Sequence, residues 1–450
     1  MGKKKHDKGG GADKGGKVGK KKNAKGAKSP LAEAQNLQKK AEKQGARGNF
    51  NPQALQAYHT AIEAYLAVYR ETNATDALVG LAECYFYSAE LKFASTAVLD
   101  HISKEKEAEE QTVFLCKQSC DCYGKILEQS DVEHREEVLV NLGSSLSVWA
   151  EASAYPDSLG IFDQALRQYD SSLAIRPDSD TLLNKGDLLK RMAEEVLDAT
   201  PPDVGRARVL LDLADKAYRA CLAESDSSRG DDLTGLTESW GSLYMVWSQA
   251  LKGSPQDQDV ALQRALAQFN GATELDVTST KGMNGVGDVF MQRAELSSLF
   301  TPQQRYQFCE SALTKGYNRA LSVNRNEVDA AVGVGEAHFQ MGKILREIGD
   351  APNACANFLA SAQRYSSVRS NEMLWKEFGS VQERSDFLYN AACALAACAQ
   401  TSQNQEREGF LREAIQVLEQ CMAFGAVTAA DVQSDEELLL VAQTIYGGRQ

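Results

Sequence analysis

The stretch Ala165–Pro177, ALRQYDSSLAIRP, decides the fold because most of the remaining chain repeats its pattern. It sets a small residue, the ring of Tyr169, a second small residue and Pro177 at the spacing small-x3-aromatic-x2-small-x4-Pro. Upstream, residues 139–146 follow an apolar-x2-apolar-Gly-x2-apolar pattern around Gly143. Small residues allow two helices to approach closely, and a large ring fills the space against the next pair. The two segments therefore predict an antiparallel helical hairpin.

The same register recurs in seven further segments. They are Ala54/Tyr58/Ala61, Ser119/Tyr123/Ile126, Ala214/Tyr218/Cys221, Ala265/Phe269/Ala272, Leu313/Tyr317/Ala320, Ala354/Phe358/Ser361 and Ala414/Leu418/Cys421. The helix expected before most of these segments carries a small residue at the point of close approach, which we call the mark. The marks are Ala82, Gly143, Gly186, Gly241, Gly287, Gly335 and Ala392. Glycine inside a helix costs about 0.5–1 kcal/mol relative to alanine, so its recurrence at the mark indicates a packing requirement.

This pair of patterns resembles the tetratricopeptide repeat (TPR), whose W-x2-L-G-x2-Y, A-x3-F and P positions form a packing code. The resemblance implies an all-α fold, a right-handed α-solenoid of about seven TPR-like helical hairpins. The chain departs from the family in repeat length: successive marks from Gly143 to Gly335 lie 43, 55, 46 and 48 residues apart, against about 34 in an ordinary repeat. We therefore expect longer first helices or longer connectors.

Composition agrees with an extended helical array. A chain of 450 residues exceeds what one compact core normally covers. Proline is scarce, with 9 residues, and the 10 cysteines are scattered, which favours free thiols in a reducing compartment. No apolar run approaches the roughly 18 residues of a membrane span, and no secretory signal precedes the array. We predict a cytoplasmic location, a nuclear location or both, with no membrane contact.

Charge divides the chain into two parts. Residues 1–28 hold eleven lysines and two aspartates, a net charge of +9, whereas the remaining residues carry −22. We expect a disordered Lys/Gly-rich basic tail at 1–30, a repeat array at 31–430 and a C-terminal capping helix at 431–450. The tail has three open interpretations: a nuclear import signal, a grip on RNA or ribosomes, or a solvating segment without a partner. Its lysine clusters are Lys3, Lys4, Lys5, Lys20, Lys21 and Lys22.

The sequence contains no convincing catalytic or metal-binding constellation. The five histidines are dispersed. Cys116, Cys120 and Cys122 have no second ligand pair at the spacing of a zinc site. The glycines of GVGDVF and GVGEAH fall inside expected helices with no preceding strand, so they are not dinucleotide-binding motifs. We predict a protein that is not an enzyme and that needs no cofactor and no metal.

The TPR resemblance implies a concave groove lined by the first helices, at positions two before, one after and four after the mark. One after the mark stand Glu83, Ser144, Asp187, Ser242, Asp288, Glu336 and Cys393, of which four are acidic. The other two rows supply amides and apolar side chains. The predicted groove residues are Glu83, Asn141, Asn184, Asp187, Asp288, Glu336, Asn390, Met245, Met291 and Phe339.

An acidic groove favours an extended, basic protein partner. We therefore predict an interaction scaffold or adaptor. Two alternatives stay open: a dedicated chaperone or nuclear import adaptor for a basic client such as a ribosomal protein or histone, and an RNA- or ribosome-associated factor acting through the tail. Some TPR proteins use a clamp of lysine, arginine and asparagine side chains to hold the acidic C-terminal tails of chaperones. Here Gly235 and Ser239 occupy the positions where this clamp needs lysine and arginine, so binding of such tails is disfavoured. The sequence leaves the partner and the oligomeric state undecided.

Overall fold

The computed structural model describes residues 29–45, 51–95, 102–129, 131–225, 230–378, 380–402 and 404–446. The basic tail, including Lys3–Lys5 and Lys20–Lys22, lies outside these residues. Apart from one π-helical segment, the regular elements of the described residues are α-helices and short 3₁₀ turns, and no strand occurs among them. Within this part of the chain, no helix is both long and apolar enough to cross a lipid bilayer.

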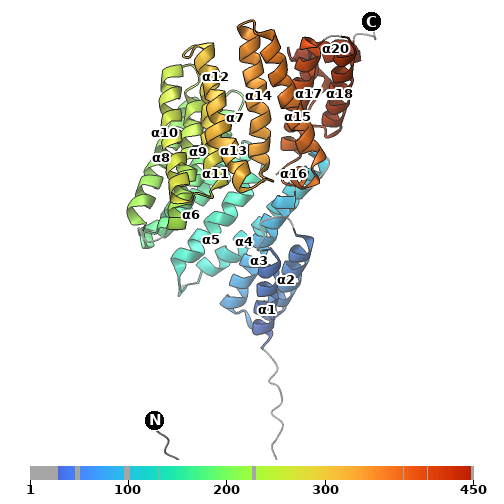
Figure 1. The fold of residues 1–450 in the computed structure, drawn as a ribbon. Coiled ribbons are helices and arrows are strands. Elements are labelled where there is room, and N and C mark those ends of the chain that lie inside the picture. The colour runs from blue at the N-terminus through green and yellow to red at the C-terminus, as the bar shows by residue number, and fades with distance from the viewer. Residues whose placement is uncertain are drawn as a thin grey trace, which may run out of the picture.

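Consecutive helices pair as antiparallel hairpins (Figure 1). The pairs are α1 (Pro30–Gly45) with α2 (Pro52–Thr72), α3 (Thr75–Ala94) with α4 (Ile102–Leu127), α5 (Arg135–Glu151) with α6 (Asp157–Ile175), α7 (Ser179–Asp198) with α8 (Val204–Glu224), α9 (Gly230–Ala250) with α10 (Pro255–Leu275), α11 (Thr280–Glu295) with the broken helix α12 (Pro302–Ser311), η2 (Ala312–Tyr317) and α13 (Asn318–Val323), α14 (Val328–Glu347) with α15 (Ala351–Ser370), and α17 (Val381–Thr401) with α18 (Asn404–Ala423).

The described residues thus form eight hairpins, one more than the approximate number expected, because α1 completes the first of them. The short helix α16 (Glu372–Lys376) connects the last two hairpins. Beyond α18, where the sequence analysis expects one capping helix, the chain forms two short helices, α19 (Ala429–Ser434) and α20 (Leu439–Tyr446). Val432 and Val441 of these helices are buried in the C-terminal part of the core.

The predicted packing code operates as close contact between the marks and the rings. A methyl group added to Gly143 would lie 2.7 Å from the Tyr169 ring, and one added to Gly287 would lie 2.5 Å from the Tyr317 ring. Real Cβ atoms essentially never approach a neighbour so closely. Glycine at these marks is therefore required by the ring that the second helix inserts.

In α15 the register lies one heptad later than predicted. The ring against Gly335 is that of Tyr365, whereas the expected Phe358 packs against Gly342. Ser361 Oγ donates a 2.8 Å hydrogen bond to the carbonyl oxygen of Gly335, as Ser119 Oγ does to that of Ala82 in the second hairpin at 2.9 Å. Helix α15 contains two overlapping patterns of a small residue followed by a ring, Ala354/Phe358 and Ser361/Tyr365. The prediction chose the first, whereas the second packs against Gly335.

The extra repeat length lies in the helices rather than in the connectors. The first helices α7, α9 and α14 have 20, 21 and 20 residues, and the connector from α9 to α10 covers only residues 251–254. Longer helices deepen the layer that each hairpin adds to the solenoid.

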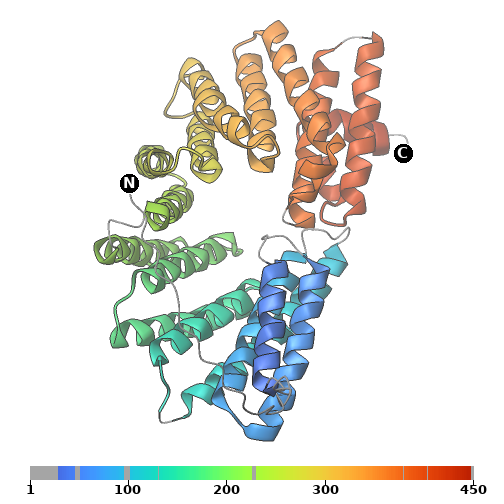
Figure 2. The same cartoon turned by 60° about the horizontal axis from the view of Figure 1, so that its bottom comes forward.

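The array curves until its two ends meet. Consecutive first helices contact one another, as α3 does α5, α5 does α7, and α11 does α14, so they form the inner layer of the curve. In Figure 2 the red hairpins lie above the blue ones, and α4 contacts α17. The first helices therefore line the concave side of the curve, which we call the hollow.

Candidate functional site

Carboxylates recur on the successive first helices that line the hollow, and Asp187 lines a cavity there. The predicted row one residue after the mark supplies Asp187 on α7, Asp288 on α11 and Glu336 on α14. In two of these cases the tyrosine behind the mark reaches through to the carboxylate: Tyr218 donates to Asp187 at 2.7 Å and Tyr317 donates to Asp288 at 2.8 Å. These aspartates therefore serve the packing of their own hairpins as well as facing the hollow.

Asp288 has an unusual environment for an aspartate. Its residue surface is exposed to solvent, yet desolvation by the surrounding protein raises the pKa of its carboxyl group to about 7. The nearby carboxylates of Glu336 and Asp329 raise it further, and the Tyr317 hydroxyl acts in the opposite direction. Asp288 is therefore a carboxylate that is exposed at its surface and yet surrounded by protein and by other carboxylates.

The other two acidic positions of the row have amide partners. Gln38 of α1 donates a 2.7 Å hydrogen bond to Glu83 and accepts one of 2.6 Å from Tyr65, so Glu83 belongs to a network between the first three helices. Asn390 of α17 donates to Glu336 at 3.4 Å, which brings two predicted groove residues together. Burial is the main cause that raises the pKa of both Glu83 and Glu336.

The remaining predicted groove residues are less uniform. Asn141 is exposed on α5, and Asn184 lines a cavity on the concave face. Met245 and Met291 are half-buried and pack against the core. The Phe339 ring lies 5.6 Å from the ring of Phe358 in its own hairpin. The apolar row is therefore used mostly for packing within the array.

A second acidic row, eight residues after the mark, escaped the sequence reasoning. Seven residues separate it from the first row, almost two helical turns, so both rows lie on one face of each helix. Its glutamates are Glu90, Glu151, Glu194 and Glu295 on α3, α5, α7 and α11. Extending the groove positions by two turns along each first helix would have found it.

The protein environment raises the pKa of all four glutamates of this second row, with loss of hydration as the largest cause. The charge of Glu151 raises the pKa of Glu90, and the charge of Glu194 raises that of Glu151. The carboxylates of neighbouring first helices therefore repel one another. Arg191 offsets part of this charge, at 3.9 Å from Glu151 and 3.8 Å from Glu194. Glu151 and Glu194 are half-buried, whereas Glu90 and Glu295 are exposed. Carboxylates of like charge this close together favour the approach of a cation.

Three adjoining cavities run along this part of the concave face, and Glu151 lines all of them. The first, of about 640 Å³, lies between α1, α2, α3 and α5 and has mostly apolar walls. The second, of about 510 Å³, contains Glu194, Glu195 and Asp198. The third, of about 390 Å³, contains Asn184 and Asp187 from the predicted groove. Because Glu151 is common to all three, we describe them together as one groove with an apolar end at the first cavity. The other two cavities carry mixed charge, since Arg191 lines both of them and Lys190 and Lys281 line the third.

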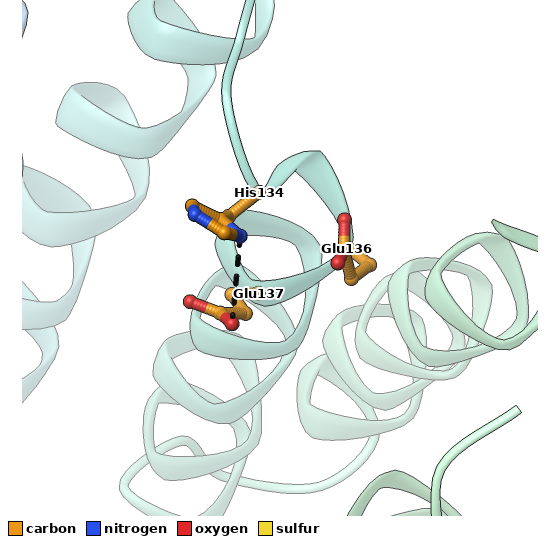
Figure 3. Close-up of side chains that lie close together, drawn as sticks. All are labelled: His134, Glu136 and Glu137. Carbon is orange, nitrogen blue, oxygen red and sulfur yellow. Dashed lines mark ion pairs between the residues drawn. The ribbon is translucent and has the colours of Figure 1, made fainter. Parts of the chain in front are cut away.

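Two other clusters lie away from this groove. Figure 3 shows His134, Glu136 and Glu137 at the start of α5; His134 and Glu137 are exposed, and Glu136 is paired with Arg176 at 3.4 Å. On α4, burial raises the pKa of Cys116 above its usual range and that of Cys122 to about 11, which keeps the thiols protonated. Neither the exposed His134 cluster nor the protonated thiols of α4 offers a set of ligands arranged to bind a metal ion.

No protein-family model matches the chain, and no curated protein matches it. The helical hairpins, the glycine marks opposed by rings and the curved inner layer of first helices decide the architecture. The described residues form an all-helical repeat array, an α-solenoid of hairpins.

The chain is similar to several solved structures at low sequence identity. The nuclear import adaptor Nro1 from S. pombe is 12% identical over 69% of this chain and 99% of that chain, with a TM-score of 0.42. A human IFIT1 dimer with PPP-AAAA is 13% identical over 92% of this chain and 91% of that chain, with a TM-score of 0.34. A STAND protein with a tetratricopeptide repeat sensor from Pyrococcus horikoshii is 9% identical over 88% of this chain and 54% of that chain, with a TM-score of 0.40. These likenesses concern architecture alone.

Proposed function

We propose that this TPR-like protein is a non-catalytic interaction scaffold that holds an extended, basic segment of a partner protein in its acidic hollow. The observation that carries the proposal is the row Glu90, Glu151 and Glu194, which lines adjoining cavities on the concave face. Desolvation, and after it neighbouring carboxylates, raise the pKa of these glutamates, although Glu90 remains exposed. Lysine or arginine side chains of a partner would relieve both costs at once.

Helix spacing suggests the pattern of the bound segment. Packed helices lie about 8–10 Å apart, and an extended chain advances about 3.3 Å per residue. A basic residue at roughly every third position would therefore meet successive first helices α3, α5 and α7. The partner segment that fits best is extended and periodically basic.

A dedicated chaperone or import adaptor for a basic client, in the cytoplasm or the nucleus, is the narrower form of this proposal. Such a chaperone would shield the positive charge of its client with the carboxylates of Glu90, Glu151 and Glu194. The charge of the hollow supports the basic character of the client and leaves its identity to experiment.

The test compares two triple variants with equal loss of charge. Glu90→Gln/Glu151→Gln/Glu194→Gln alters the hollow, whereas Glu63→Gln/Glu224→Gln/Glu274→Gln alters exposed positions on second helices. The probe is a fluorescein-labelled peptide with lysine at every third position, measured by fluorescence anisotropy at low and at physiological salt. A glutamate version of the peptide reports non-specific binding.

The natural chain should bind the lysine peptide and not the glutamate peptide. Each lost carboxylate should weaken binding by about tenfold, as expected for a charge-assisted hydrogen bond, while the control triple variant should stay within about twofold of the natural chain. Equal affinity of the hollow variant and the natural chain would refute the proposal. Circular dichroism of both variants establishes that each remains folded.

A further inference from the structure

The apolar end of the groove has a shape and composition distinct from the rest of the hollow. Tyr58, Tyr87, Leu91, Phe93 and Ala94 line the 640 Å³ cavity together with Val148. The rings of Tyr58 and Tyr87 stack with centroids 5.8 Å apart, and Tyr87 remains 39% exposed. The volume is within the range of about 300–1,000 Å³ that is usual for ligand pockets.

Carboxylates surround this apolar surface. Glu42 of α1, Glu90 of α3 and Glu151 of α5 line the same cavity. No basic side chain is among the residues that line it. An apolar group entering the cavity would therefore bring its flanking residues against negative charge.

We propose that this cavity receives one bulky apolar side chain, such as leucine or phenylalanine, from the partner segment, with basic residues on either side of it. The inference rests on the proposed function and adds a specificity determinant to it. Burial of the apolar side chain selects the position of the segment, and the three carboxylates select the charge of its neighbours.

The chain's own tail matches only half of this requirement. Residues 1–28 supply eleven lysines, but Val18 is their largest apolar side chain after Met1. The lysines of the tail can thus form ion pairs with the carboxylates, but the tail has no large apolar side chain to fill the cavity. A partner that carries a leucine between basic residues would have an advantage over the tail at this end of the groove.

The test uses the full chain and two labelled peptides with lysine at every third position, which differ only in a central leucine or alanine. Ala94→Phe places a ring in the cavity, and Ala94 lines neither of the other two cavities. Ala223→Phe makes the same change at an exposed position of α8. Anisotropy titrations measure the ratio of the two affinities for each protein.

The natural chain and Ala223→Phe should prefer the leucine peptide by about 10- to 100-fold, as burial of one leucine side chain predicts. Ala94→Phe should bind both peptides with the affinity that the natural chain has for the alanine peptide. Equal binding of the two peptides by the natural chain would overturn the inference and leave the proposed function intact. A preference that survives in Ala94→Phe would also overturn it, and failure of both peptides to bind would overturn the proposed function itself.

Discussion

Tyr317 performs two tasks at once: its ring fills the space that Gly287 leaves open, and its hydroxyl donates a 2.8 Å hydrogen bond to the neighbouring Asp288. The backbone geometry is equally tight, since a methyl group on Gly316 would lie 2.5 Å from the Gly287 nitrogen. Gly316 and Tyr317 both belong to the π-helical segment η2. Packing between the two helices of this hairpin and placement of charge in the hollow are therefore coupled.

Gly287→Ala should destabilise the protein by about 1–3 kcal/mol, because the added methyl group collides with the Tyr317 ring. Gly271→Ala on α10 is the matched control, since a methyl group there meets nothing within 4 Å. The control should gain about 0.5–1 kcal/mol from helix propensity. Urea unfolding of both variants measures the difference, and destabilisation of the same size in both would contradict the packing role of the mark.

Tyr317→Phe should raise the pKa of Asp288 above its value of about 7, because the tyrosine hydroxyl stabilises the ionised carboxylate. The ring is retained, so the packing against Gly287 should change little. Carbon-detected NMR titration of the aspartate carboxyl groups provides the measurement. A pKa that is unchanged or lower in the variant would show that the hydrogen bond does not favour the charged form.

Stability should depend on the charge of Asp288 in a defined pH window. Its folded pKa of about 7 exceeds the ordinary value of 3.8, so the folded state binds the proton more tightly than the unfolded state. The resulting stabilisation is fully present below about pH 3.8 and is lost as the pH rises through about 7.

Asp288→Asn keeps an acceptor for Tyr317 and removes this titration. The variant should gain in melting temperature relative to the natural chain as the pH is raised from 5 to 8, because only the natural chain must then charge a poorly hydrated carboxylate. Thermal unfolding across that range measures the difference. Parallel curves for the two proteins would mean that Asp288 titrates at its ordinary pKa.

The contact between α4 and α17 should hold the array closed. Desolvation raises the pKa of Glu105 on α4, and the backbone N–H of Val381 and the charge of Arg384, both on α17, act in the opposite direction. Glu105→Arg places a cation at the positive end of a helix and should cost about 1 kcal/mol. Small-angle X-ray scattering should show a larger radius of gyration than for Glu110→Arg, an exposed control on the same helix. Identical scattering from the two variants would show that the contact does not maintain the closure.

The sequence by itself determined the hairpins, because their code is local. The sequence spacing of Gly143 and Tyr169, and that of Gly287 and Tyr317, reflects a contact between the two helices of one hairpin. The same spacing elsewhere in the chain therefore predicts the same contact. It also placed Asp187 and Asp288 on the inner helices. The match at Phe358 failed because α15 contains a second small and aromatic pair at Ser361 and Tyr365, and only packing against Gly335 distinguishes the two.

Only the tertiary structure decided which charges belong together. The position of Glu90 near Glu151 and the joining of three cavities at Glu151 depend on how each hairpin is rotated relative to the next. The contact of α4 with α17 depends on the sum of these rotations over the array. Each rotation is small and arises from many side-chain contacts, so curvature accumulates along a solenoid without any single residue encoding it. The acidic rows can therefore be read from the sequence, whereas the distances between their carboxylates depend on how the hairpins pack.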